Sequence, residues 1–336
     1  MRPLKINWKL LVSLGLGALF IFLAFRQVDL RQMGRAFATA DYVWLLPSLL
    51  LIFLGFYLRT LRWKYLLEPV RPVKLGVLFS ALMVGYMANT VLPAHLGELA
   101  RAYLVGKKES LRASAVFASI VIERIIDVFT LLAFMALAMI IFPSFPPWVR
   151  QSGFITLAVM LALLAVLLLM KRFRTQSLRL LEKLTTALPR RLRERLNSML
   201  HSFLDGVTPL KNRWRYLQVT LLSVLIWICY GLVFQLNFYS FGFQRDYVLP
   251  WSAALVLLVI TTISVVVPSS PGYIGTYHYL CQLSLAFFGI PKGPALTYAF
   301  VLHAINIFPP FILGLFFFYR ERLSFKTIRA ADPAKP

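Results

Sequence analysis

Charged residues are scarce in this sequence, and acidic residues are the scarcest. Only 15% of the 336 residues are charged, and 13 Asp and Glu stand against 36 Lys and Arg. A soluble globular chain is usually about 25% charged and about 45–50% apolar. Here 59% of the residues are hydrophobic and the mean hydropathy is +0.73. This composition excludes an ordinary water-soluble surface, so a bilayer must solvate much of the chain.

Cysteine is nearly absent as well. Cys229 and Cys281 are the two cysteines of the chain, and both lie in apolar runs. Two such thiols offer neither a disulfide framework nor a Cys-rich metal site. The sequence also contains no His-Glu-x-x-His zinc motif and no phosphate-binding loop of the Gly-Lys-Ser/Thr type. We therefore expect no metal, no cofactor and no enzymatic activity.

The net charge of +23 would suggest nucleic acid as a partner if the protein were soluble. Here the basic residues lie in short segments beside the apolar runs, which is typical of loops on the cytoplasmic side of a membrane. We therefore expect anionic lipid headgroups as the partner, and no nucleic acid.

Six apolar runs are long enough to cross a bilayer, because about 20 residues of helix span a hydrocarbon core about 30 Å thick. They lie at 8–25, 42–58, 113–142, 153–170, 216–241 and 294–319. Basic residues precede the first run as in a signal peptide, but the nearest cleavage-like site, 38–40, lies too far downstream. We expect a retained helix there and predict an all-α, polytopic membrane helical bundle.

Two further apolar stretches, 75–104 and 250–289, are interrupted by Pro and Gly. Each predicts either a re-entrant helical hairpin or a full crossing plus a loop. Lys and Arg accumulate in cytoplasmic loops, which places both termini, a loop at 59–74 and the basic segment 101–112 inside. This favours a hairpin for 75–104 that enters from the cytoplasm, whereas 250–289 would enter from the outer side as a second hairpin or as two short crossings. We expect one domain over 1–320, with a basic tail at 321–336, in a bacterial inner membrane.

The segment 171–215 is strongly basic and long enough to form a surface element. Leu192, Leu196, Met199 and Phe203 recur there at helical spacing among arginines. Two interpretations stay open, namely amphipathic helices lying on anionic lipid and a solvated cytoplasmic linker.

The two interrupted stretches share one pattern. Asn89, Pro93 and Gly97 follow one another at intervals of four residues. Ser264, Pro268 and Gly272 have the same spacing. Such breaks persist in mid-membrane only where protein buries them or a wet cavity solvates them. Broken helices in corresponding positions indicate a transport site built from inverted repeats. The alternative is a pair of ordinary kinks in packed helices.

Ionisable side chains within the spans are candidate binding residues, since each costs at least about 2.5–3.5 kcal/mol to insert. Glu98 and Arg101 follow the first break at a spacing that lets them pair with each other or bind a zwitterionic headgroup. Glu123, Arg124 and Asp127 lie deep in a predicted span, with both acids on one helical face. They predict either a closed ion-pair network or a site for a substrate or coupling ion.

Other candidates flank the two breaks. They are Asn89, His95, Ser269, Ser270, Gly272, His278 and His303. The two serines and the glycine belong to a turn that we expect at the N-terminus of a half-helix. The turn either binds a lipid phosphate at this N-terminus or only caps the helix with side-chain hydrogen bonds. The histidines are either packed, hydrogen-bonded side chains or members of a proton relay.

Four short motifs occur in order along the predicted membrane elements. They are Leu61-Arg62-Trp63, Asn89-x-x-Leu92-Pro93-x-x-x-Gly97-Glu98-x-x-Arg101, Glu123-Arg124-x-x-Asp127 and Pro268-x-x-Pro271-Gly272-x-x-Gly275. On these motifs the chain resembles, over about residues 55–320, the flippase-like membrane family that shares its fold with the transmembrane region of lysylphosphatidylglycerol synthases.

The resemblance implies lipid translocation, because that membrane region is similar to a flippase that moves aminoacylated phosphatidylglycerol outward. The chain ends at Pro336 and leaves no room for the large soluble domain of aminoacyl transfer, so we expect it not to make the lipid. Tyr273 and His278 stand where many relatives carry Gly and Glu, and the lost carboxylate suits a less cationic headgroup.

We therefore expect a flippase that moves a phospholipid, an aminoacylated lipid or a polyprenyl-linked glycolipid along a path lined by the candidate residues. One alternative is a membrane-embedded lipid-modifying transferase, with Glu98 or Asp127 as general base. Another is an accessory subunit that holds a glycosyltransferase or lipid synthase at the membrane through 171–215. Self-association into a homo-oligomer also stays open.

Overall fold

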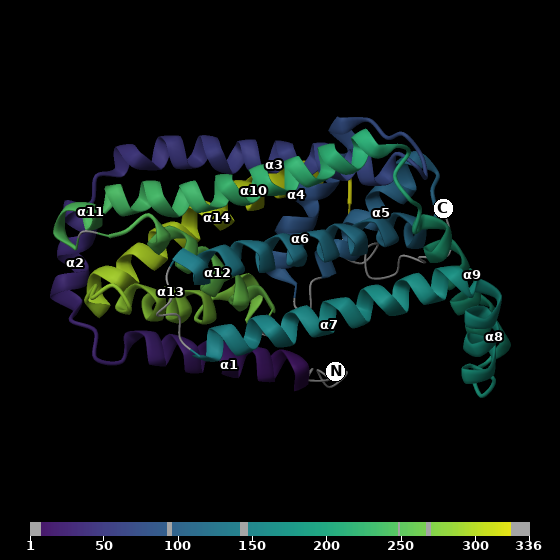
Figure 1. Cartoon of the computed structure of the whole chain (residues 1–336), viewed down its shortest axis with the longest axis horizontal. Helices are drawn as coiled ribbons and strands as arrows, with labels where there is room; N and C mark the ends of the chain where they lie inside the picture. The colour runs from purple at the N-terminus through teal and green to yellow at the C-terminus, as the bar shows by residue number, and fades with distance from the viewer. Residues whose placement is uncertain (1–7, 93–95, 142–146, 248, 267–269, 324–336) are drawn as a thin grey trace, which may run out of the picture.

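The computed structural model describes residues 8–92, 96–141, 147–247, 249–266 and 270–323, and these residues form helices and loops without a strand. The predicted all-α helical bundle is therefore confirmed (Figure 1). The helices are α1 Trp8–Phe25, α2 Leu30–Thr39, α3 Leu45–Leu67, α4 Leu75–Val91, α5 Leu96–Glu109, α6 Ala113–Ile141, α7 Pro147–Arg172, α8 Arg174–Leu184, α9 Arg190–Gly206, α10 Arg213–Ser240, α11 Phe243–Asp246, α12 Ser252–Val266, α13 Thr276–Ala286 and α14 Lys292–Arg320, with short 3-10 turns η1 Tyr42–Trp44 and η2 Pro271–Tyr273.

Five segments of the described chain are long and apolar enough to cross a bilayer. They are Tyr42–Leu67, Ala113–Ile141, Arg150–Arg172, Arg213–Ser240 and Lys292–Arg320. Each contains most of one of the predicted spans. The remaining predicted span, 8–25, forms helix α1, and its crossing of the bilayer stays a prediction.

Helix α3 continues beyond the end predicted for its span at residue 58. It ends at Leu67, and its last turns bury Arg59 and Arg62, which are 7% and 0% exposed. The residues after 58 were predicted as a basic cytoplasmic loop because Lys and Arg usually mark such loops. That prediction is wrong as far as Leu67, because buried acids on a neighbouring helix pair with both arginines and allow the helix to continue.

The end of α3 is joined to the start of α10 by a half-buried ion-pair group. Arg215 Nε lies 2.9 Å from Glu68 Oε2, and Lys211 Nζ lies 3.2 Å from Glu68 Oε1. Burial alone would raise the pKa of Glu68, but the hydrogen bonds and charges of Lys211 and Arg215 outweigh it and lower that pKa below its ordinary value. Helices α3 and α10 run side by side from this point (Figure 1).

The basic segment 171–215 forms helices α8 and α9 at one end of the molecule, beyond the long helices (Figure 1). Helix α9 packs on α6, where Arg112 Nη1 donates to Ser202 Oγ at 2.8 Å. Leu180 and Leu184 of α8 remain 57% and 73% exposed. An apolar face beside many arginines is typical of a helix on a lipid surface, and contact with anionic lipid stays a prediction.

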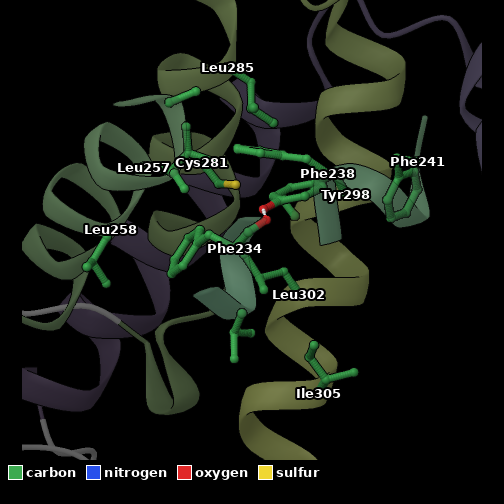
Figure 2. Packing of buried hydrophobic residues seen from close by; sticks show 14 of the residues in the cluster. Phe234, Phe238, Phe241, Leu257, Leu258, Cys281, Leu285, Tyr298, Leu302 and Ile305 are labelled. Carbon is green, nitrogen blue, oxygen red and sulfur yellow. Dashed lines mark hydrogen bonds between the residues drawn. The ribbon is translucent and has the colours of Figure 1, made fainter. Parts of the chain in front are cut away.

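The largest apolar cluster of the described residues joins helices of the second half of the chain to one another and to α3 and α4. Tyr298 of α14 is fully buried, its hydroxyl donates to the backbone oxygen of Phe234 at 2.9 Å, and its ring stacks on Phe238 with centroids 5.3 Å apart. Cys281 of α13 and Leu257 of α12 belong to the same cluster (Figure 2). This core holds α10, α12, α13 and α14 together and fixes one wall of the cavity described below.

Both interrupted stretches form pairs of helices in contact, α4 with α5 and α12 with α13. At the first break, Asn89 Oδ1 accepts a hydrogen bond from the backbone N–H of Gly97 at 2.7 Å. Gly97 packs so closely on Gly85 that a Cβ added to it would overlap the Gly85 carbonyl oxygen. The two breaks also meet, because a Cβ on Gly272 would lie 3.7 Å from Cγ2 of Thr90. Entry of the two pairs from opposite membrane faces stays a prediction.

Replacing Gly97 by Ala should therefore separate α4 from α5. We expect Gly97→Ala to lower the free energy of unfolding by about 1–3 kcal/mol, because the added methyl overpacks a backbone contact. The matched control is Gly76→Ala on α4, where an added Cβ meets nothing within 4 Å. Denaturant unfolding of the purified protein in detergent measures both variants. Equal stability of the two variants would contradict the close packing.

Candidate functional site

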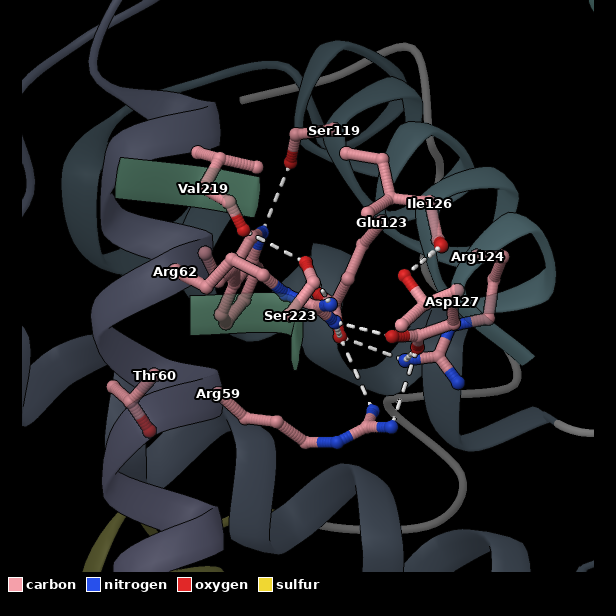
Figure 3. Close-up of polar contacts among 12 residues, drawn as sticks. Arg59, Thr60, Arg62, Ser119, Glu123, Arg124, Ile126, Asp127, Val219 and Ser223 are labelled. Carbon is pink, nitrogen blue, oxygen red and sulfur yellow. Dashed lines mark hydrogen bonds and ion pairs between the residues drawn. The ribbon is translucent and has the colours of Figure 1, made fainter. Parts of the chain in front are cut away.

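A cluster of charged side chains lies inside the bundle where four helices meet (Figure 3). Helix α3 contributes two arginines, α5 one arginine, and α6 an arginine and two acids, whereas α10 contributes neutral partners. The charged members are Arg59, Arg62, Arg101, Glu123, Arg124 and Asp127. These contacts bring together four of the predicted site residues and two arginines that were not predicted as site residues.

Glu123 is the most heavily paired acid of the cluster and is fully buried. Its Oε2 lies 2.8 Å from Arg101 Nη2, and its Oε1 lies 2.7 Å from Arg124 Nη2. Arg59 and Arg62 approach the same Oε1 at 3.4 and 3.6 Å. A carboxylate in a low-dielectric interior is tolerated only with such compensation.

Asp127, one turn further along α6, faces the same cluster. Its carboxylate lies 2.6 Å from Arg62 Nη2, 3.1 Å from Arg124 Nη2 and 3.2 Å from Arg59 Nη2. The i, i+4 spacing of the two acids therefore places both on one face of α6, where arginines of α3, α5 and α6 itself converge.

Neutral groups hold the arginines in place. Arg62 Nη1 donates to Ser223 Oγ at 2.9 Å, and Arg59 Nε donates to the Tyr230 hydroxyl at 2.7 Å, so both are tied to α10. The guanidinium of Arg101 lies over the ring of Trp63, 3.9 Å from its centroid. Such stacking suits a planar, weakly hydrated guanidinium better than an ammonium.

Arg101 does not pair with Glu98, although the two lie three residues apart on α5. Its side chain passes over Gly85 and reaches Glu123, whereas the nearest cation to Glu98 is Arg124, whose Nε lies 4.0 Å from Oε1. The predicted ion pair is therefore absent from the described contacts. Because Gly85 has no side chain, the side chain of Arg101 can extend past it to Glu123.

Arg59 and Arg62 were not among the site residues predicted from the sequence. Their signal was their spacing of three residues at the end of a long apolar run, which puts both on one helical face. The loop assignment of that segment hid this signal, even though Leu61-Arg62-Trp63 was one of the motifs that carried the family resemblance.

A cavity of about 310 Å³ opens beside the cluster, between the two breaks. Arg59, Glu98 and Arg124 bring the charge of the cluster to its wall, whereas Glu123 and Asp127 do not line it. Gly272 also lines the cavity. The neutral polar residues of the wall are Tyr86, Asn89, Thr90, Tyr230, Thr261, Thr262, Tyr273, Tyr277, His303 and Asn306. Although many of these residues are polar, apolar atoms form most of the exposed wall surface, as is typical of small-molecule sites.

The second break differs from the predicted capped half-helix. Helix α13 begins at Thr276 after the N-cap Gly275, and Ser270 Oγ donates to the backbone oxygen of Ile274 at 2.6 Å instead of capping a helix. Gly272 lies in the short turn η2 with a φ of 68°, a conformation that favours glycine. Ser269 lies outside the described residues, and a phosphate-binding role of this turn stays a prediction.

His278 and His303 lie close together, and His303 forms part of the cavity wall. The Nε2 atom of His303 lies 2.9 Å from the backbone oxygen of Gly272, and the rings of His278 and His303 have centroids 4.7 Å apart. His278 is 3% exposed, and its Nδ1 lies 3.3 Å from the backbone N–H of Gly275, which donates to it. A proton relay stays a prediction, and His95 lies outside the described residues.

Among the described residues, no group of three or more His, Cys, Asp or Glu side chains could hold a metal ion.

A family model described as "Lysylphosphatidylglycerol synthase TM region" matches residues 9–314 of the chain. A comparison with curated proteins found no match. The matched range contains the whole charged cluster and every described residue of the cavity wall.

Removing the charge of Glu123 should destabilise the protein strongly. We expect Glu123→Gln to lower the free energy of unfolding by about 3–5 kcal/mol, because it leaves buried arginines without their shared partner. The matched control is Glu194→Gln, which breaks an exposed Arg190–Glu194 pair of α9 and should leave stability unchanged within error. Denaturant unfolding in detergent compares the two, and a Glu123→Gln variant as stable as the control would contradict a structural role.

Proposed function

The chain belongs to the family of lysylphosphatidylglycerol synthase transmembrane regions, and on that basis we propose that it is a lipid flippase. The family implies a function connected with membrane lipids. The observation that supports translocation is the cavity between the two interrupted helix pairs, which brings charged and hydroxyl side chains into a bundle of apolar helices.

The surface and the interior of the bundle have opposite characters, as a lipid carrier requires. Leu50 and Ile140 are 71% and 77% exposed on membrane-length helices, so the outer surface suits acyl chains. A lipid headgroup leaves water only where protein groups replace its hydration. The arginines and neutral polar side chains of the cavity supply such groups, while the acyl chains stay in the bilayer.

We propose that the protein carries lipid without modifying it. Glu123 and Asp127, the buried carboxylates, are used in ion pairs and do not line the cavity. A general base must lie within hydrogen-bond reach of the proton that it removes. Glu98 is the one acid on the described cavity wall, so the described wall offers no pair of carboxylates that could act as general acid and general base.

We also propose a bacterial inner membrane as the location, with α8, α9 and both termini on the cytoplasmic side. The basic residues of α8 and α9 support this orientation, because Lys and Arg are retained on that side. Anionic lipids are the proposed partner of this surface.

Translocation can be tested in reconstituted vesicles that contain a phosphatidylglycerol with a fluorescent headgroup label, quenched from outside by dithionite. We expect the protein to expose label from the inner leaflet, and Asn306→Phe to reduce the rate to that of protein-free vesicles by filling the cavity. The matched control is Ile312→Phe on the same helix α14, where the side chain is 61% exposed to the outside. Equal rates for both variants would refute a headgroup path through this cavity.

A further inference from the structure

The buried cluster carries more positive than negative charge. Its positive members are Arg59, Arg62, Arg101 and Arg124, and the acids in contact with them are Glu98, Glu123 and Asp127. Four arginines against three carboxylates give the group one excess positive formal charge. An uncompensated charge in a membrane interior is costly and marks a missing partner.

Arg124 presents this excess charge to the cavity. The side chains of Arg62 and Arg101 are only 0% and 4% exposed, whereas that of Arg124 is 38% exposed and lines the cavity wall. Its Nη2 binds both Glu123 and Asp127, but its Nε has no hydrogen-bond acceptor among the described residues. This buried Nε faces Glu98 Oε1 at 4.0 Å, so an anion in the cavity would meet the exposed remainder of the Arg124 side chain.

The rest of the cavity wall offers neutral polar groups. Asn306 of α14 and Thr90 of α4 both line it, and their side chains supply hydrogen-bonding atoms without charge. Glu98 is the one described acid of the wall, and it lies 4.0 Å from Arg124 Nε, so the field of that arginine already offsets its charge. Within the described wall, no second acid remains to receive an ammonium group.

We propose that the cavity selects a lipid headgroup with one net negative charge, carried by a phosphate ester, and without an amine. This inference rests on the proposed function and names its substrate class. Guanidinium groups bind phosphate oxygens through paired, charge-assisted hydrogen bonds. The headgroup anion supplies the negative charge that the cluster lacks. An aminoacylated headgroup brings one ammonium group, or two in the lysyl ester, which cancel or outweigh the charge of its own phosphate and leave the arginine excess in place.

Binding is measured by native mass spectrometry of the full protein in detergent, with phosphatidylglycerol, lysylphosphatidylglycerol and diacylglycerol as lipid probes. We expect phosphatidylglycerol to bind about tenfold more tightly than lysylphosphatidylglycerol, the equivalent of one charged contact, and diacylglycerol to bind weakest. The inference is overturned if lysylphosphatidylglycerol or diacylglycerol binds as tightly as phosphatidylglycerol or more tightly. Inorganic phosphate is added as a competitor, and displacement of the lipid at equal concentration would identify free phosphate as the ligand and overturn the lipid assignment.

Two substitutions of opposite sign separate recognition from misfolding. Arg124→Gln should weaken phosphatidylglycerol binding about tenfold, and Glu98→Gln should strengthen it, because the second change raises the net positive charge at the wall. The matched control is Arg245→Gln on α11, where the arginine side chain is 86% exposed. This variant should leave the affinity for phosphatidylglycerol unchanged. Unchanged or weakened binding by Glu98→Gln in a folded protein overturns the inference.

The same lipids in the vesicle assay distinguish this inference from the proposed function. Preferential binding of phosphatidylglycerol without translocation of any lipid would refute the flippase and leave the headgroup preference standing. Translocation of both labelled lipids at equal rates, together with equal binding, would support the flippase and refute the preference.

Discussion

The pairing of Glu123 and Asp127 with four arginines is the interaction on which the rest of the fold depends. The two acids sit one turn apart on α6, and their partners come from α3, α5 and α6. In a bilayer these charges cannot turn to water, so the helices must keep the arrangement that satisfies them. The position of α3 and α5 around α6 thus follows from charge compensation, and the apolar contacts then fill the space between them.

The cluster also fixes what the cavity offers to a ligand. Glu123 and Asp127 are paired with arginines and do not line the cavity. The wall therefore presents Arg124 and the carboxylate of Glu98 among neutral side chains. The interrupted helices supply the opposite side, and their lost helical hydrogen bonds are replaced locally. Gly97 donates to Asn89, and the Gly272 carbonyl lies within hydrogen-bond distance of His303. The breaks are therefore stabilised by polar side chains and keep a defined shape.

Much of the fold could be predicted because the bilayer imposes simple rules. Long apolar runs indicate helices, the repeated Pro and Gly spacing indicates paired breaks, and charges such as Glu123 stand out against an apolar span. The site could be predicted only in part. Arg59 and Arg62 resemble the basic residues of a cytoplasmic loop until their acidic partners are known, and those partners lie on a helix that is distant in the sequence.

The start of α13 escaped prediction for a related reason. Sequence spacing suggests a cap near Ser270, yet the helix begins only after Gly275, whose φ is 92°. A Cβ at Gly275 would overlap the Gly17 carbonyl oxygen of α1. The register of this turn is thus set by close contact with a helix from the other end of the chain, and local propensity does not contain that contact.

The distribution of charge over the helices has a consequence for how the protein enters the membrane. Arg59, Arg62 and Arg101 are synthesised before Glu123 and Asp127, so these arginines precede their counter-ions during insertion. Until α6 arrives, the long side chains of Arg59 and Arg62 must reach for the headgroups from their place near the end of α3. The arginines of α3 and α5 thus gain their buried counter-ions only once α6 has been added.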